Sequence, residues 1–206
     1  MKSAWIILTV AVCLSQPSAS QQQKPCFTCI LSSFSAYVSA LLNNESVLFT
    51  KLGEGQAKQT IIDVHTEAGQ LWSKNDKLAK DLIARNVTRN ELAERVSRLT
   101  SDVQHFDNSL TMFSGEIAKA SNLTSSALQN QIQSHINSKL EDLRRISDLD
   151  PSDLSQRDEA LKFLKLSNNE LEQVQHGTKC LLDSIALKAP ACDPNTFESL
   201  DSSQHK

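Results

Sequence analysis

The sequence contains little of what a β-sheet requires. Only 5% of its 206 residues are aromatic, and the β-branched and aromatic residues do not gather into short alternating runs. Proline is absent from residues 26–150, so this long stretch lacks the residue that most strongly breaks helices. Leucine, alanine, serine and the longer polar residues recur instead at helical spacings. We therefore expect an all-α chain.

A strong excess of charge of one sign is also absent, and so is a long apolar run in the body of the chain. The sequence has 21 basic and 24 acidic side chains, a formal net charge of −3, which gives no general attraction for nucleic acid. After residue 20, no stretch reaches the ~20 consecutive apolar residues that a membrane-spanning helix needs. We expect neither nucleic-acid binding nor a membrane span.

Residues 1–20 combine the three parts of a secretory signal peptide. Lys2 supplies the positive start, residues 4–14 form an apolar run, and small residues end the segment at Ser20. The apolar run is too short to cross a bilayer, which argues against a membrane anchor. We predict cleavage after Ser20 and secretion of the remaining chain to the extracellular space.

Cysteine is missing from the whole middle of the chain. Apart from one in the predicted signal peptide, the cysteines lie near the two ends, at Cys26, Cys29, Cys180 and Cys192. An oxidising secretory route favours disulfides, and this placement predicts that they tie the ends of a helical body together. Four cysteines allow three connectivities, among which the sequence does not choose.

A redox dithiol and a zinc site are the alternatives to structural disulfides. Cys26 and Cys29 have the spacing of a redox dithiol, but no strand precedes them, and redox dithiols follow strands. A zinc site would need Cys180, Cys192 or His176 as further ligands, and this spacing matches no common zinc module. Structural disulfides are the favoured interpretation.

The most regular pattern is a four-three rhythm of eight apolar residues between Leu92 and Ile117, which we call the seam. When the same rhythm is extended backwards from the seam to Ile61, it gives seventeen positions in all, of which fourteen are apolar. Asn75, Arg85 and Arg89 are the exceptions. The seam consists of Leu92, Val96, Leu99, Val103, Phe106, Leu110, Phe113 and Ile117.

The two arginines mark a predicted break in this rhythm. Thr88 to Glu91 has the sequence of a capping box, in which the threonine and the glutamate each satisfy a free backbone N–H at a helix start. We therefore predict that one helix ends and another begins near residues 86–88. A single uninterrupted helix of some 60 residues, about 90 Å long, is the alternative.

Other turn signals divide the rest of the chain. Gly53 to Gly55 predicts a turn, and Pro151 is placed at a first helical position. A second capping box at Ser167 to Glu170 would interrupt the last helix if it were used. The expected helices cover residues 28–52, 56–85, 88–119, 124–148 and 151–188.

Each predicted helix has one apolar stripe that must be covered. We expect an elongated up-and-down helical bundle of four to six helices with coiled-coil-like packing over residues 21–188, followed by a polar tail over residues 189–206. Asn75 leaves an alternative open, because a buried asparagine can fix the register of a two-stranded coiled coil. The seam would then mediate self-association.

Three sequons, at Asn44, Asn86 and Asn122, predict N-glycans on a secreted chain. Metal-binding, phosphate-binding and nucleophile motifs are missing, and the histidines are scattered. We expect no enzyme activity, no cofactor and no metal. The predicted protein acts by binding or structural association, with an unknown protein partner or through its own seam. The alternative is an exchangeable carrier of lipid or small apolar ligands.

Overall fold

The computed structural model describes residues 34, 38–43, 46–121 and 126–193, and within these ranges the chain is helical and contains no strand. The all-α prediction is confirmed for this part of the chain. The prediction of one helix over 28–52 is wrong, because Phe34 and residues 38–42 are helical, Asn43 lies in a turn, and a separate helix begins at Ser46. The helices with defined bounds are α2 Ser46–Gly53, α3 Gln56–Ile83, α4 Arg89–Ser121, α5 Ser126–Ser147 and α6 Leu154–Leu187.

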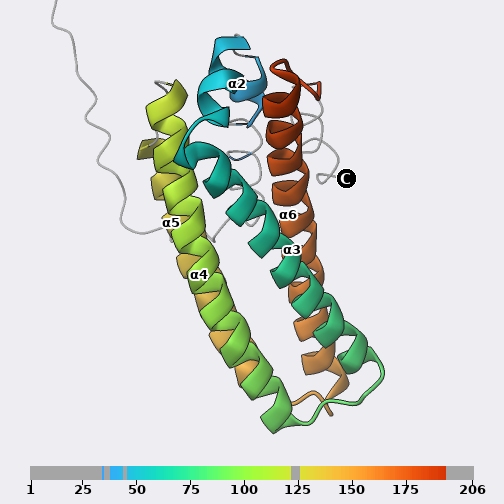
Figure 1. Cartoon of the computed structure of the whole chain (residues 1–206). Helices are drawn as coiled ribbons and strands as arrows, with labels where there is room; N and C mark the ends of the chain where they lie inside the picture. Colours follow the sequence, from blue (N-terminus) through green and yellow to red (C-terminus); the bar gives the residue numbers. More distant parts are fainter. Residues whose placement is uncertain (1–33, 35–37, 44–45, 122–125, 194–206) are drawn as a thin grey trace, which may run out of the picture.

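The four long helices lie alongside one another as extended rods, and α2 covers one end of them (Figure 1). α3 packs most extensively against α6, and α4 packs against both α3 and α5. α5 and α6 approach each other less closely than these pairs do. The turns from α3 to α4 and from α5 to α6 lie at the end opposite α2, so the arrangement is bundle-like (Figure 1).

The predicted break between the second and third expected helices is confirmed. α3 ends at Ile83, and Arg85 takes a positive φ of 59° that turns the chain out of the helix. The capping box then starts α4. The backbone N–H and the hydroxyl of Thr88 each donate to Glu91 Oε2 at 2.8 Å, and the Glu91 N–H donates to Thr88 Oγ1 at 3.3 Å.

The predicted start of the last helix is wrong. Residues 151–153 form a turn and bend, and α6 begins only at Leu154. Asp153 precedes it, and its side chain accepts a hydrogen bond of 3.0 Å from the Gln156 N–H. Aspartate is a strong N-cap, so the helix begins after Asp153 and not at the proline.

The second capping box does not interrupt α6, which continues from Leu154 to Leu187. Ser167 and Glu170 do not cap a new helix there. Both side chains are buried, and they bond to α3 and α5 respectively. The local pattern is present, but its two polar groups are used for contacts between helices.

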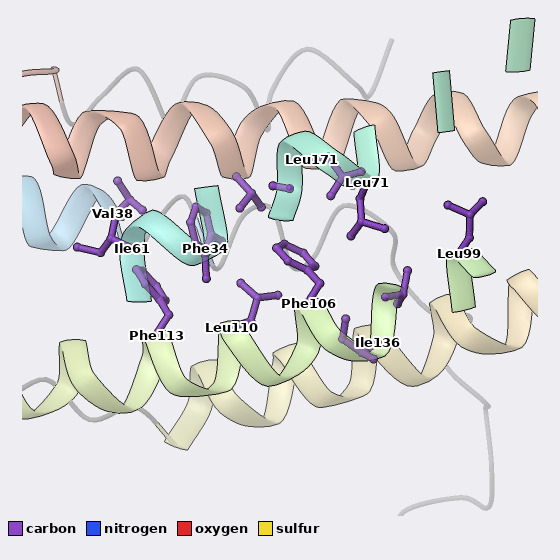
Figure 2. Packing of buried hydrophobic residues seen from close by; sticks show 14 of the residues in the cluster. Phe34, Val38, Ile61, Leu71, Leu99, Phe106, Leu110, Phe113, Ile136 and Leu171 are labelled. Atoms are coloured by element: carbon purple, nitrogen blue, oxygen red, sulfur yellow. The ribbon is translucent and has the colours of Figure 1, made fainter. Parts of the chain in front are cut away.

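All eight seam residues are buried, and none is more than 7% exposed. Figure 2 shows Phe106, Leu110 and Phe113 of α4 pointing into the space between the helices, toward α3 and α6. The residues that cover the seam come from the same chain. Full burial of a leucine or phenylalanine side chain contributes about 1.5–3 kcal/mol, so the seam is a main source of stability.

Phe34 and Val38 lie between α4 and α6 and complete this core at the end near α2 (Figure 2). The ring centroids of Phe34 and Phe113 are 5.9 Å apart. Gly177 of α6 makes room for the phenylalanine, because a Cβ at this position would lie 2.8 Å from Phe34 Cε1. The glycine is required here for close approach and not for backbone conformation.

Asn75 is 5% exposed and donates from its side-chain amide to the hydroxyl of Ser167 in α6, at 3.2 Å. The buried asparagine therefore has a partner within the chain. This contact favours the bundle interpretation over a parallel coil of two chains, in which asparagine would pair with its own copy.

Candidate functional site

A polar cluster lies inside the bundle, where α3, α5 and α6 meet. Lys139 of α5 forms an ion pair with Glu170 of α6, and each side chain is only 8% exposed. The hydrogen bond between Asn75 and Ser167 lies beside this pair, because Ser167 and Glu170 are three residues apart on one face of α6. The cluster joins α3 and α5 to the same turn of α6.

These four residues also line a cavity of about 40 Å³. A buried water needs roughly 10–15 Å³, so the cavity has room for about three water molecules. Ligand pockets typically measure about 300–1,000 Å³, so a lipid does not fit unless the helices separate. The apolar lining consists of Leu71, Leu99, Val103, Phe106, Leu110, Ile136, Leu143, Phe163, Leu171 and Val174.

A larger depression lies on the outside, between α3 and α4, and we call it the α3/α4 groove. It has a volume of about 270 Å³ and is lined by Lys74, Lys77, Leu78, Arg95, Arg98, Leu99 and Asp102. The two leucines are buried and form an apolar floor, while cations from both helices form the walls. A predominantly basic groove is unexpected on a chain with a net charge of −3.

Three of the four cations in the groove have carboxylate partners. Lys74 lies 2.6 Å from Asp102, Arg95 lies 2.6 Å from Asp81, and Arg98 pairs with Glu94. Lys77 is exposed and has no ion pair among the residues that the structure describes. The groove therefore has one more cation than the carboxylates that neutralise it.

The Cys180–Cys192 disulfide is local, with the two Cα atoms 5.8 Å apart. α6 ends at Leu187, and Lys188 takes a left-handed conformation that turns the chain back toward the helix. The expected link between the two ends of the chain is therefore not made by these two cysteines, because they bond to each other. Cys26 and Cys29 lie outside the described residues, as does the predicted signal peptide.

Of the three predicted glycosylation sites, only Asn86 can be located. It is exposed and lies in the turn between α3 and α4, where an acceptor asparagine is accessible to a modifying enzyme. Asn44 and Asn122 lie outside the described residues, as does the part of the predicted polar tail after Asp193.

Histidine and carboxylate side chains are not brought together into a metal site in the described part of the chain. His65 of α3 instead contacts α6, with Nδ1 3.0 Å from Thr178 Oγ1 and 3.2 Å from the Gln175 carbonyl oxygen. His105 of α4 lies 3.3 Å from Glu67 of α3. These histidines link neighbouring helices.

The sequence patterns predicted neither the ion pair between Lys139 and Glu170 nor the α3/α4 groove. One signal for Lys139 was present, because it lies three residues after Ile136 and four before Leu143, on the apolar face of its helix. No comparable signal marks the groove. Its cations belong to two helices, and the distance between them depends on how those helices pack.

The described helices include none that is both long enough and apolar enough to cross a membrane. No known protein family, curated protein or solved structure matches this chain.

Proposed function

We propose that this chain is a secreted, N-glycosylated helical protein that acts by binding a partner through its exterior surface, without catalysis. The proposal includes an elongated up-and-down bundle of four to six helices with coiled-coil-like packing. The observation that carries it is the burial of the complete seam by helices of the same chain. Because the seam is already buried, a partner can contact only the outer faces of the helices.

The interior gives this proposal further support. Among the described residues, the two most deeply buried charges, on Lys139 and Glu170, neutralise each other, and Asn75 is bonded to Ser167. Buried polar groups that satisfy one another stabilise one packing arrangement and are not free to act on a substrate. The local disulfide is compatible with an extracellular location.

Expression of the full chain in a eukaryotic secretory cell line tests the proposal. We expect the medium to contain a monomer by light scattering, lacking residues 1–20 and losing mass when N-glycans are removed enzymatically. An Asn86→Gln variant should lose the mass of one glycan and keep its fold, because the side chain of Asn86 is exposed. Retention in the cell, or a dimer at micromolar concentration, would overturn the proposal.

A carrier of small apolar ligands is the second candidate, and the interior cavity favours it. The cavity has an apolar lining with four polar groups, which is the usual composition of a ligand site. Its volume of about 40 Å³ requires α5 to move away from α6 before a lipid could enter. Clearance of lipid vesicles by the purified protein would support this candidate, and unchanged vesicle turbidity would reject it.

A further inference from the structure

We propose that the α3/α4 groove binds a small organic anion that bears a sulfate or phosphate ester. The inference rests on the proposed binding function and names a ligand class for it. The groove has a volume of about 270 Å³, close to the lower limit for ligand pockets and well above that of the interior cavity.

The arrangement of the cations suits a tetrahedral oxyanion. Lys77 and Arg98 come from opposite walls of the groove, and both are exposed. An arginine presents several N–H donors in a plane that matches the oxygens of a phosphate or sulfate group, and a lysine adds a mobile point charge. The apolar floor of Leu78 and Leu99 lies where the organic body of the ligand would rest.

The carboxylates near the groove do not prevent this binding. Asp102 lines the groove and is paired with Lys74, while Asp81 is paired with Arg95. Glu94 pairs with Arg98 in the most exposed of these ion pairs, with side chains 63% and 72% exposed. Exposed ion pairs contribute little, so Arg98 can turn from Glu94 to an anionic sulfate or phosphate ester at small cost.

The net negative charge of the chain allows specific binding of an anion to be distinguished from general electrostatic attraction. Because the whole protein is negatively charged, general attraction does not bring anions to it, and binding must come from a local site. The appropriate probes share one sugar: N-acetylglucosamine 6-sulfate, N-acetylglucosamine 6-phosphate and unmodified N-acetylglucosamine. Titration of the full chain, followed by the Nε–H resonances of its arginines, gives the affinity for each.

We expect one or both esters to shift the resonances of Arg95 and Arg98, and the unmodified sugar to leave them unchanged. The variant Lys77→Ala/Arg98→Ala should weaken ester binding about tenfold, since it removes two charged contacts. A control variant, Lys162→Ala/Lys165→Ala, makes the same change of net charge on exposed positions of α6 and should change the affinity less than about twofold.

The relative affinities of the two esters identify the source of the oxyanion. Absence of shifts with both esters, equal binding of the unmodified sugar, or equal weakening in both double variants would overturn the proposal. Helical circular dichroism of each variant distinguishes lost binding from lost folding. Secretion and monomeric mass do not depend on the groove, so failure of this experiment leaves the proposed binding function to its own test.

Discussion

The ion pair between Lys139 and Glu170 is predicted to be strongly coupled. Each side chain is 8% exposed, so removing one partner leaves a buried charge without its counterion. Breaking a buried pair in this way typically costs about 3–5 kcal/mol, whereas replacing both members by apolar residues of similar size is often neutral or stabilising. The expected free energies of unfolding therefore differ sharply between single and double variants.

Urea denaturation of four proteins measures this coupling: the wild type, Lys139→Met, Glu170→Leu and the double variant. We expect each single variant to lose about 3 kcal/mol, and the double variant to lie within about 1 kcal/mol of the wild type. The adjoining cavity of about 40 Å³ has room for water, which places the expected loss at the lower end of the range.

Two results would refute this reasoning. Losses below about 1 kcal/mol in both single variants would mean that water in the cavity solvates the charges as well as bulk solvent does. A double variant that loses the sum of the two single losses would mean that the residues act independently. As a control for the loss of a lysine, Lys119→Met changes an exposed residue of α4 and should alter stability by less than about 0.5 kcal/mol.

Three further predictions concern local features. Thr88→Ala removes the two capping-box hydrogen bonds of the Thr88 hydroxyl and should lower the free energy of unfolding, measured in urea, by about 1 kcal/mol, while an unchanged midpoint would contradict the cap's role. Gly177→Ala should destabilise the protein by about 1–3 kcal/mol because the new Cβ would collide with Phe34. The control Gly115→Ala, where a Cβ has no neighbour within 4 Å, should be neutral or stabilising. Thermal melts in which Gly177→Ala is the more stable of the two variants would reject this account. Burial raises the pKa of Asp107, so the folded state binds its proton more tightly than the unfolded state does. The free energy of unfolding of the wild type therefore falls as pH rises from the pKa of Asp107 in the unfolded state through its higher pKa in the folded state. Asp107→Asn should raise the free energy of unfolding by less than about 1 kcal/mol at pH 7 and should leave it unchanged near pH 2. A gain that persists at pH 2 would exclude this electrostatic cause.

Features that depend on neighbours in sequence were predictable. The break between α3 and α4 follows from the capping box at Thr88 and Glu91, whose hydrogen bonds join residues only three positions apart. The burial of the seam follows from the helical period, since residues at this spacing lie on one side of α4. These signals act over one or two helical turns, and the sequence displays them directly.

The same local reasoning was wrong where a residue could serve more than one purpose. Ser167 and Glu170 have the spacing of a capping box, yet they bond to Asn75 and Lys139 on other helices. Nothing within α6 distinguishes the two uses, because the difference lies in which helices pack against it. The cysteines present the same problem: Cys180 pairs with Cys192 because the chain reverses after α6.

The sequence by itself determined that the described part of this chain is helical, that one helix ends and the next begins near residues 84–88, and which face of α4 is buried. It did so because hydrogen bonding and helical periodicity are local. Only the tertiary structure decided that the seam is covered by the same chain, that Lys139 meets Glu170, and that Lys77 and Arg98 face one groove. Those facts depend on the register between helices, which no single helix encodes.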